Sequence, residues 1–384
     1  MRNFTFKSPD ELVVENGATK NLGLYLSKLN VSKVIITTDE VIMNVGIYDK
    51  VVQALEKENI EHVVYSKVQP EPPVENVYEA LDLYNENNCD GVLGLGGGSA
   101  MDVAKAVAML VTNPGKYEDF VGIGNVPNKS APLVLMPTTS GTGSEVSVFS
   151  IMIVDGSKAG VVDKNILADV ALVDPLLTLS VPRGVTAATG LDAICHHIES
   201  YISTNDSPIC DAICLEGIKN VGAHLRKAVG DGDDHEARYW MSYASTLGGF
   251  VMNLTDGAAA NHGLAFALGA KFQVGHGLSN AVMLPYVLPV VGLASLDKVR
   301  NIGEALGEDL KGLSDREALD HTVQAITSLV KDVGCNIPMR DFGVKEEDIN
   351  MLTQEVIDTQ GRVMGHSRYQ LTSNEIKAIF REAL

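Results

Sequence analysis

In the N-terminal half of the chain, over residues 1–180, short runs of β-branched and apolar residues alternate with stretches whose apolar positions recur with a helical period. The runs predict buried strands over residues 33–38, 62–65, 91–95, 133–137 and 151–154. The stretches between them predict amphipathic helices over residues 47–59, 74–87 and 100–111. Strands that alternate with helices are typical of a mainly parallel sheet covered on both faces. The first part of the chain is therefore expected to be an α/β domain.

The pattern changes near Pro182, where the β-branched runs give way to long helical segments. These segments predict helices over residues 184–203, 207–228, 236–253, 297–306, 317–333 and 373–383. A length of 384 residues fits two or three domains of ordinary size. We therefore expect two domains, an α/β domain over residues 1–180 and an all-helical domain over residues 181–384.

The net charge of the chain indicates which binding partners are not expected. The chain has 30 lysine and arginine residues against 49 aspartate and glutamate residues, which gives a formal charge of −19. A negative surface repels phosphate backbones and anionic lipids, so neither nucleic acid nor a membrane is expected as a partner. The apolar run over residues 282–296 contains Pro285 and Pro289 and is shorter than the roughly 20 residues that span a bilayer.

The cysteines and the start of the sequence bear on the compartment. The chain has five cysteines, an odd number, without a CxxC pair or a dense framework, which favours free thiols in a reducing environment. The segment from Met1 to Gly17 contains no apolar core of the signal-peptide type. We expect a cytoplasmic protein.

Two glycine-rich segments directly follow predicted strands. Residues 94–99 read Gly-Leu-Gly-Gly-Gly-Ser and precede a predicted helix, so backbone N–H groups and the helix N-terminus could bind a phosphate. Ser99 stands where a GxGxxG fingerprint has its third glycine, and a tight strand-to-helix turn is the alternative interpretation. Residues 137–145, Pro-Thr-Thr-Ser-Gly-Thr-Gly-Ser-Glu, have hydroxyls suited to a polyol or a pyrophosphate, with a flexible linker as the alternative.

Asp39 directly follows the first long predicted strand. A carboxylate there could accept hydrogen bonds from both hydroxyls of an adenosine ribose and repel a 2′-phosphate, which would select NAD over NADP. Taken alone, an acidic residue in this place is more often part of a turn or a helix cap.

The helical half contains candidate metal ligands. Asp192 and His196 lie four residues apart, on the same side of a predicted helix, and His262 and His276 each stand beside a glycine. Three imidazoles and one carboxylate could enclose a divalent metal and leave a position open for a substrate oxygen. His197 points about 100° away from His196 and is expected to pack or to form hydrogen bonds instead. For any two of these histidines, an ordinary core or solvated position remains the alternative.

Five segments together resemble the iron-containing (group III) alcohol dehydrogenases. They are GGGSAMDVAKA (96–106), PTTSGTGSEV (137–146), LADVALVDP (167–175), TAATGLDAICHHIESY (186–201) and HGLAFALGAKFQVGHGLSNAVMLP (262–285). The resemblance extends over nearly the whole chain. It implies an N-terminal α/β dinucleotide-binding domain and an all-α C-terminal domain of the dehydroquinate synthase-like fold, with the active site in the cleft between them.

The resemblance also assigns roles to single residues. It implies that Asp192, His196, His262 and His276 are metal ligands and form the catalytic centre. It implies that NAD is bound by Asp39, Gly96, Gly97, Gly98, Ser99, Asp102, Thr138, Thr139, Thr142 and Lys158. Phe149 and Phe266 are expected to line the substrate pocket. Fe²⁺ is the default metal of the family, and the ligand set would also accept Zn²⁺.

Three positions depart from the family pattern. Phe266 stands where many members have a histidine, four residues after the third ligand, so proton relay must follow another path. Glu71 replaces a frequent asparagine near the cofactor, and an Asn-Pro-Arg motif near the C-terminus is present only as residues 365–368, Gly-His-Ser-Arg. An apolar Phe266 would favour short or medium unbranched alcohols over substrates that carry a carboxylate.

The expected function is a metal- and NAD(H)-dependent interconversion of small primary alcohols or diols with aldehydes, by a homodimer or larger homo-oligomer. One alternative is a hydroxyacid dehydrogenase or hydroxyacid–oxoacid transhydrogenase of the same family, which would need a cation for the substrate carboxylate. Lys271 is the nearest basic residue to the ligand segments. A catalytically idle metal- and nucleotide-binding scaffold is the alternative from a different class.

Overall fold

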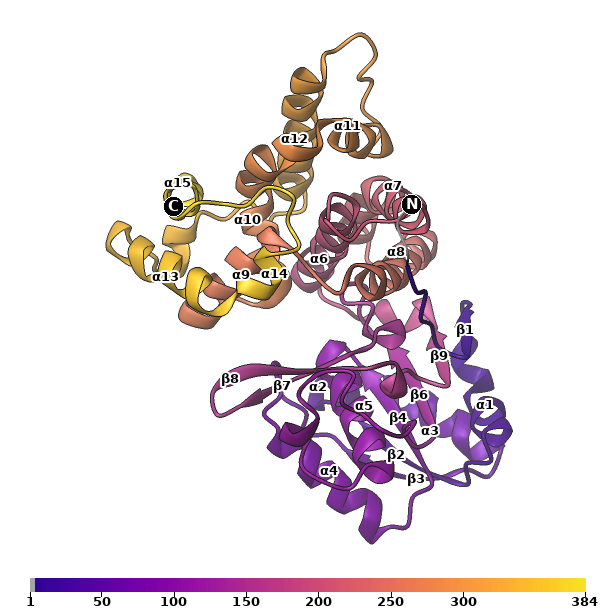
Figure 1. Cartoon of the computed structure of the whole chain (residues 1–384). Helices are drawn as coiled ribbons and strands as arrows, with labels where there is room; N and C mark the ends of the chain where they lie inside the picture. Colours follow the sequence, from indigo (N-terminus) through magenta and orange to yellow (C-terminus); the bar gives the residue numbers. More distant parts are fainter. Residues whose placement is uncertain (1–3) are drawn as a thin grey trace. The chain divides into compact units, whose positions relative to one another are not determined.

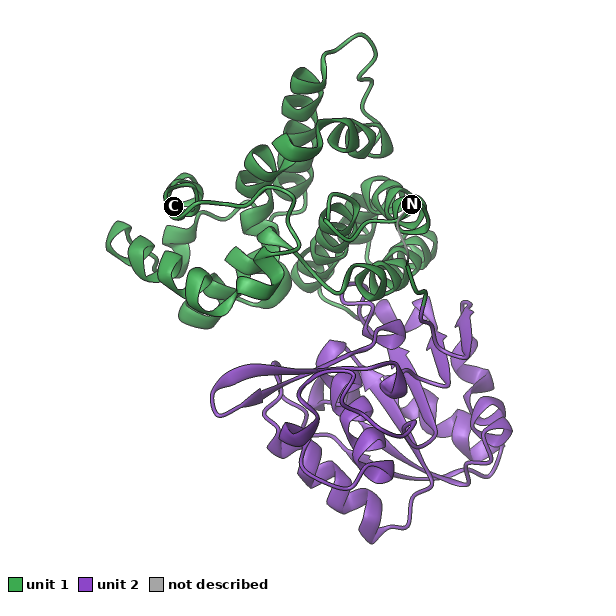
Figure 2. Ribbon diagram, viewed as in Figure 1, with its two compact units in different colours: residues 1–6, 181–384 green, residues 7–180 purple. Residues whose placement is uncertain are grey.

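The computed structural model describes residues 4–384, which form two compact units (Figure 2). One unit comprises residues 7–180, and the other comprises residues 181–384 together with residues 4–6. The α/β and all-helical fold classes expected for the two parts of the chain are confirmed (Figure 1).

The first unit is built on a six-stranded sheet with the order β1-β9-β6-β4-β2-β3, in which every neighbouring pair is parallel. The strands are β1 (Glu11–Val14), β2 (Lys33–Thr37), β3 (Glu61–Tyr65), β4 (Gly91–Gly96), β6 (Leu133–Pro137) and β9 (Val170–Val173). All residues of β4, β6 and β9 are buried. This is the burial expected of central parallel strands covered on both sides.

Alternate residues of β2, β4 and β6 join two different apolar clusters. Val34 and Ile36 belong to the cluster that contains helices α1, α2 and α3, whereas Ile35 belongs to the cluster that contains α4 and α5. The helices are α1 (Leu22–Lys28), α2 (Glu40–Asn44), α3 (Ile47–Lys57), α4 (Glu75–Glu86) and α5 (Gly98–Thr112). The period-2 alternation of side chains in a strand thus places one layer of helices on each face of the sheet.

A second, three-stranded sheet corrects one expectation. The strand predicted at residues 151–154 is present as part of β7 (Phe149–Val154), but it does not extend the parallel sheet. It pairs antiparallel with β8 (Ser157–Val162), which also pairs with the short β5 (Gly122–Ile123). Asp155 and Gly156 connect β7 and β8, with φ values of 49° and 77°. Two left-handed residues in succession form the tight turn that favours a hairpin.

The second unit contains ten α-helices in the part of the chain that the structure describes. They are α6 (Arg183–Tyr201), α7 (Pro208–Gly230), α8 (His235–Thr255), α9 (Ala260–Phe272), α10 (His276–Val291), α11 (Leu296–Ala305), α12 (Asp315–Asp332), α13 (Ile349–Thr359), α14 (Gly361–Met364) and α15 (Ser373–Ala383). Their apolar residues form one continuous core. Ser207, Asp234, Ser314 and Thr372 each accept a backbone N–H at the start of a helix, as preferred N-cap residues do.

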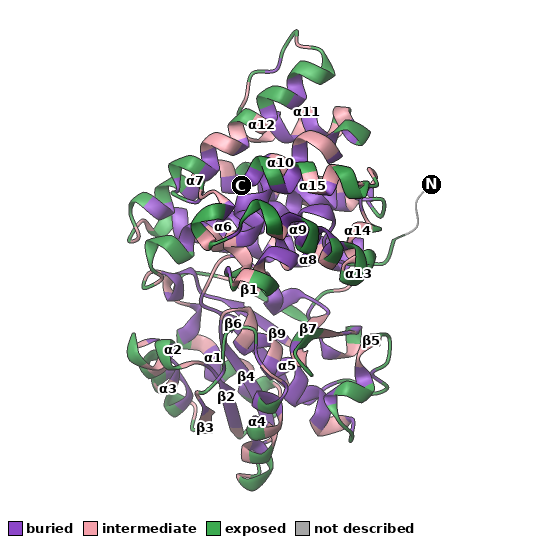
Figure 3. Cartoon of the chain, turned by 90° about the vertical axis from the view of Figure 1, so that its left-hand side faces the viewer, coloured by how far each residue is buried: buried purple, intermediate pink, exposed green. Residues whose placement is uncertain are grey.

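By length and composition alone, the helical stretch from His276 to Ala305 could cross a membrane. However, 56 % of its most apolar 18-residue segment is buried inside the protein. The stretch consists of α10, a short 3₁₀ turn and α11, and it contributes Met283, Leu284 and Leu288 to the core of its unit. Figure 3 shows how buried and exposed positions are distributed over the helices. Burial of this kind is typical of a core helix in a folded protein.

Candidate active site

The four candidate ligands come together in the helical unit. Asp192 and His196 lie on α6, His262 lies in the first turn of α9, and His276 is the first residue of α10. One ligand atom from each residue lies within 4.8 Å of the others. From Oδ1 of Asp192, the Nε2 atoms of His276, His262 and His196 are 3.5, 3.6 and 4.0 Å away.

Local packing explains how three separate helices meet at this point. The spacing of four residues places Asp192 and His196 on the same side of α6, which is buried over most of its length. α10 approaches α6 closely at Gly277, where a Cβ atom would lie only 2.6 Å from the carbonyl oxygen of Ala188. Glycine at this position therefore allows His276 to reach Asp192.

The residues fit a divalent metal. Ligand bonds of about 2.1 Å in a tetrahedral site give ligand–ligand distances of about 3.4 Å, close to those around Asp192. Within residues 4–384, Nε2 of His262 has no hydrogen-bond partner although the side chain is 1 % exposed. A buried polar atom of this kind needs a partner, and three nitrogens with one oxygen suit Fe²⁺ or Zn²⁺. Ligation by these four residues remains a prediction.

The charges of the cluster support the same interpretation. Burial alone would raise the pKa of Asp192, but the histidines His276, His196 and His262 outweigh it and lower that pKa far below the usual range. Burial lowers the pKa of His262, but Glu199 and Asp192 together raise it to about 9. Asp192 is therefore ionised at neutral pH and could supply an anionic ligand. The side chain of His276 is 30 % exposed, so this side of the cluster is open.

Two further residues complete the surroundings of the ligands, and sequence reasoning missed both. The carboxylate of Glu199 contacts Nδ1 of His262. The amide of Asn280 donates to Oδ1 of Asp192 at 2.7 Å. Glu199 follows His196 by three residues on α6, and Asn280 follows His276 by four residues on α10. Helical spacing from the ligands was therefore the signal that could have found them.

His197 and Phe266 lie where the helical directions predicted. Nε2 of His197 donates to the carbonyl of Ala244 in α8 at 2.9 Å, so this ring packs among helices and does not join the cluster. The ring of Phe266 stacks on His276, with centroids 5.3 Å apart, and meets His262 edge-on at 5.8 Å. Phe266 is partly exposed, which places an apolar surface beside the open side of the cluster.

In the α/β unit, the two glycine-rich segments lie side by side. β4 and β6 are adjacent parallel strands, with Gly96 opposite Pro137, and the Thr138 N–H donates to the Gly96 carbonyl at 2.9 Å. Gly96 has a φ of 152°, a conformation that favours glycine, and α5 begins at Gly98. The turn therefore presents the N-terminus of a 15-residue helix at the carboxyl end of the sheet, a common place for a phosphate.

The threonines of the second segment pack against this turn. A Cβ atom on Gly98 would lie 3.0 Å from Cγ2 of Thr142, and one on Gly97 would lie 3.4 Å from Oγ1 of Thr139. Gly97, Gly98 and Ser99 are partly exposed, as a ligand-binding turn requires. These close contacts exclude the flexible-linker interpretation of residues 137–145. Binding of NAD by these residues remains a prediction.

One carboxylate oxygen of Asp39 caps the N-terminus of a helix. Its Oδ1 accepts the N–H of Ile42 at 3.0 Å, at the start of α2. Its Oδ2 is close to the glycine-rich turn, because a Cβ atom on Gly96 would lie 3.7 Å from it. The helix-cap alternative is thus correct for one oxygen, and contact of the other oxygen with a ribose remains a prediction.

The remaining candidates in this unit have protein partners. Asp102 accepts from Ser144 Oγ at 2.6 Å and from the Ile151 N–H at 3.1 Å, so it fastens the second segment to α5. Lys158 Nζ forms an exposed ion pair with Glu71 Oε1 at 2.7 Å. Glu71 is the residue that replaces a frequent asparagine of the family, so this replacement gives Lys158, a candidate cofactor-binding residue, a protein partner. Phe149 is partly exposed at the start of β7. The cofactor and substrate roles of these residues remain predictions.

Comparisons with known proteins agree over the whole chain. The family model for iron-containing alcohol dehydrogenase matches residues 9–175, and the model for the C-terminal part of the Fe-containing alcohol dehydrogenase family matches residues 186–384. The chain is 38 % identical to long-chain-alcohol dehydrogenase 1 of Geobacillus thermodenitrificans over 370 residues, 96 % of this chain and 93 % of that protein. It is 33 % identical to the NAD-dependent methanol dehydrogenase of Bacillus methanolicus, over 93 % of this chain and 94 % of that protein.

Solved structures of alcohol dehydrogenases also resemble this chain. A crystal structure of 1,3-propanediol oxidoreductase matches with a TM-score of 0.96 and 32 % identity, over 100 % of both chains. Two family models together account for almost the entire sequence, including both glycine-rich segments and all four candidate ligands. The chain belongs to the iron-containing alcohol dehydrogenase family.

Proposed function

We propose that this chain is an NAD(H)- and metal-dependent alcohol dehydrogenase that interconverts small primary alcohols or diols with aldehydes. The observation that carries the proposal is the cluster of Asp192, His196, His262 and His276, whose ligand atoms lie within 4.8 Å of one another. Family membership and the glycine-rich turn at the carboxyl end of β4 supply the nucleotide side of the reaction.

Each component has a separate task. When bound, a divalent metal supplies Lewis-acid polarisation of the alcohol or aldehyde oxygen, and NAD accepts or donates the hydride at its nicotinamide. The four ligands would hold the metal, with Asp192 supplying the negative charge. Gly97, Gly98 and Ser99 would bind the pyrophosphate with backbone N–H groups, and Asp39 would accept hydrogen bonds from the ribose hydroxyls.

Phe266 supports an uncharged, unbranched substrate. Its ring lies against His262 and His276, so a substrate at the cluster would meet an apolar surface. The named relatives act on long-chain alcohols, methanol and 1,3-propanediol, all of which lack a carboxylate. Lys271, the cation that a hydroxyacid enzyme could have used, forms an ion pair with Glu355 at 2.7 Å. These observations favour alcohols over hydroxyacids.

We also propose a cytoplasmic homo-oligomer. The five cysteines are free and buried, which suits a reducing compartment. Oligomerisation rests on the family resemblance, and sedimentation of the purified protein tests it.

The test compares wild-type protein with His262→Ala and His197→Ala, each purified anaerobically and supplied with Fe²⁺. We expect wild-type protein and His197→Ala to retain metal and to oxidise NADH with aldehydes. His262→Ala should lose metal and almost all hydride transfer, because it removes one of four ligands. If His197→Ala lost the metal and His262→Ala kept it, the ligand assignment would be wrong.

A further inference from the structure

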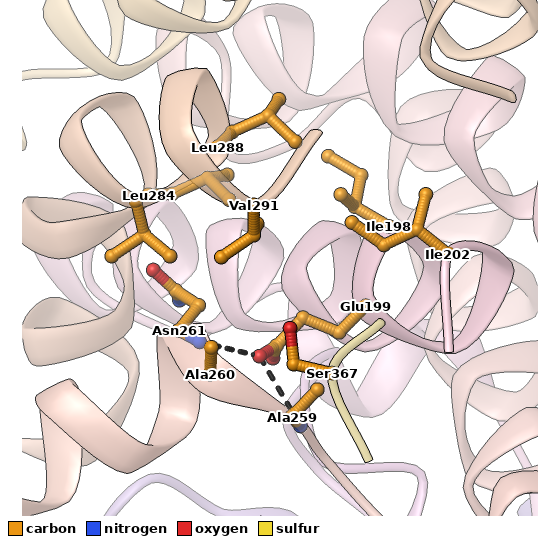
Figure 4. A pocket seen from close by; sticks show the side chains of 11 residues that line it. Ile198, Glu199, Ile202, Ala259, Ala260, Asn261, Leu284, Leu288, Val291 and Ser367 are labelled. Carbon is orange, nitrogen blue, oxygen red and sulfur yellow. Dashed lines mark hydrogen bonds between the residues drawn. The ribbon is translucent and has the colours of Figure 1, made fainter. Parts of the chain in front are cut away.

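Glu199 is a buried carboxylate beside the proposed metal centre. It lies on α6, seven residues after Asp192, and its side chain is 5 % exposed. One oxygen, Oε1, accepts the backbone N–H groups of Ala259 at 3.2 Å, Asn261 at 2.7 Å and His262 at 3.2 Å. The other oxygen, Oε2, contacts Nδ1 of His262. Figure 4 shows the carboxylate between Ala259 and Asn261, where α9 begins.

The two oxygens of Glu199 have different partners, and this arrangement determines which nitrogen of the His262 ring donates to Glu199. Glu199 accepts three backbone N–H groups through Oε1, and the same acceptor role at Oε2 makes Nδ1 of His262 the donor of the hydrogen bond between the two side chains. Nε2 is then the nitrogen that can give up its proton to a metal, and it is the atom that lies 3.6 Å from Oδ1 of Asp192. A histidine that ligates through Nε2 needs this tautomer.

The surroundings make this contact strong. Glu199 also borders a small pocket whose other walls are mostly apolar, among them Ile198, Leu284 and Leu288 (Figure 4). A hydrogen bond between an ionised group and an imidazole is stronger in such a weakly polar environment than in water.

We propose that Glu199 is a positioning residue of the metal centre: it holds His262 in the Nδ1–H tautomer and aims Nε2 at the metal. This inference rests on the proposed function, because it presupposes that the cluster binds a metal. The competing explanation is that Glu199 only caps the N-terminus of α9 through its contacts with the three backbone N–H groups.

Glu199→Gln separates the two roles, because it keeps the size of the side chain and one accepting oxygen. If the remaining side-chain oxygen stays on the backbone N–H groups, the new NH₂ group faces Nδ1 of His262 and requires a lone pair there. The ring proton then moves to Nε2 and blocks ligation. If the amide is reversed, the NH₂ group opposes three backbone donors and the cap is lost.

The experiment measures the affinity of metal-free protein for Zn²⁺ by competition with a chelator. The proteins are wild type, Glu199→Gln, His262→Ala and the double variant, with a weaker chelator for the last two. We expect Glu199→Gln to weaken Zn²⁺ binding about 10- to 100-fold, the usual effect of losing such a partner. In the His262→Ala background the same substitution should change the affinity less than about threefold, since the residue through which Glu199 acts is absent.

Asp234→Ala is the matched control for a lost helix cap. Asp234 accepts the Ala237 N–H at 2.9 Å at the start of α8, away from the candidate ligands. It should lower the melting temperature and leave Zn²⁺ affinity unchanged. Glu199→Asp retains the charge and should lose less affinity than Glu199→Gln.

Several outcomes would overturn the inference. Unchanged affinity in Glu199→Gln would do so, as would an equal loss in both backgrounds, which is the result of a general packing defect. A measurement on wild-type protein is independent of how the variants fold: in the Zn²⁺ form labelled with ¹⁵N-histidine, His262 should show a protonated Nδ1. Zn²⁺ on Nδ1 would disprove the positioning role. If wild-type protein bound no Zn²⁺, the proposed metal site itself would fail.

Discussion

At the scale of single residues, Phe266 distinguishes this chain from family members with a histidine at the same position. Its ring contacts two candidate ligands and is partly exposed. Because phenylalanine neither accepts nor donates a proton, proton release must use another route, such as water or the ribose hydroxyls.

We predict that wild-type protein prefers butanal to succinic semialdehyde by about tenfold or more, since an unpaired buried polar group costs about 1–3 kcal/mol. Phe266→His should lose part of that preference and change the pH profile of the rate. Kinetic constants for both aldehydes across pH provide the measurement. If preference and profile remain the same while thermal stability falls, Phe266 is a packing residue only.

Asp39 is the second residue-scale test. Asp39→Gly should raise NADP use and lower NAD use, because it removes both the ribose contact and the repulsion of a 2′-phosphate. Loss of an ionic hydrogen bond of about 1.5–3 kcal/mol corresponds to a roughly 10- to 100-fold change in the ratio of kcat/KM for the two cofactors. Asp39→Asn is the control that keeps the cap on Ile42 and removes the charge. An unchanged ratio in both variants would show that Asp39 does not contact the ribose.

Residues of the site differed in how well the sequence could predict them. Asp192 and His196 could be predicted because a spacing of four residues along a helix brings two side chains to the same side. Glu199 acts through His262, 63 residues away in the chain, and Asn280 acts through Asp192, 88 residues away. Helical spacing from a ligand could have marked both residues as candidates. Their partners are distant in sequence, so no local pattern identifies the contact that each one makes.

At the scale of elements, buried polar contacts hold the strands and loops that form the candidate nucleotide site. Lys105 on α5 is completely buried, and its Nζ donates to Ser144 Oγ at 2.7 Å, Ser147 Oγ at 3.1 Å and the Phe149 carbonyl at 2.7 Å. Its Nζ is also 3.4 Å from Oδ1 of Asp102. Burial lowers the pKa of Lys105, while Asp102 opposes that effect.

Lys105→Met should therefore destabilise the protein by about 3–5 kcal/mol, because it leaves Asp102, whose side chain is only 16 % exposed, without its cation. It should also weaken NADH binding about tenfold, since Ser144 and Ser147 follow the threonines that face the glycine-rich turn. Urea unfolding and NADH fluorescence titration measure the two effects. A loss of stability with unchanged NADH affinity would limit Lys105 to a structural role.

Asp90 provides a pH-dependent test of strand placement. It precedes β4, and its carboxylate accepts the N–H groups of Ser32 and Lys33 at the start of β2, at 2.9 and 2.8 Å. Burial raises its pKa, but the hydrogen bonds from Ser32 and Lys33 outweigh burial and lower it below its ordinary value. Because the folded pKa lies below that of the unfolded chain, the carboxylate stabilises the fold above about pH 4, and this contribution falls as pH drops through the folded pKa.

Asp90→Asn should reduce stability by about 1–2 kcal/mol at pH 7, and the difference from wild type should shrink below about pH 4. Melting temperatures of both proteins across this range test the prediction. A constant difference at all pH values would mean that the charge of Asp90 does not contribute.

Sequence patterns predicted amphipathic elements well and uniformly buried ones poorly. The helix pattern at residues 47–59 corresponds to α3, which buries one side only. α9 and α10 are apolar around most of their circumference, so they have no period that marks a helix, and Pro285 and Pro289 further obscure α10. β8 and β9 were also not predicted; β8 is partly exposed and depends on the hairpin turn at Asp155 and Gly156.

At the scale of the whole molecule, the change of pattern near Pro182 corresponds to the break between the two compact units after Ser180. Residues 4–6 nevertheless group with the helical unit, where the ring of Phe6 lies 5.4 Å from that of Phe250. A single aromatic contact between two residues so distant in the sequence leaves no trace in a local pattern. Pairing of β1 with β9 is hidden for the same reason, because the two strands lie at opposite ends of the sequence of their unit.

The central claim about the whole molecule is that hydride transfer requires a metal bound by four side chains of the helical unit. Titration of Fe²⁺ into metal-free protein under anaerobic conditions, with NADH formation from butan-1-ol followed at each addition, tests it most directly. We predict that the rate rises in proportion to added metal and stops rising at one equivalent per chain, and that His262→Ala shows no such break. Full activity in metal-free wild-type protein, or a rate that rises without a break at one equivalent, would contradict the account.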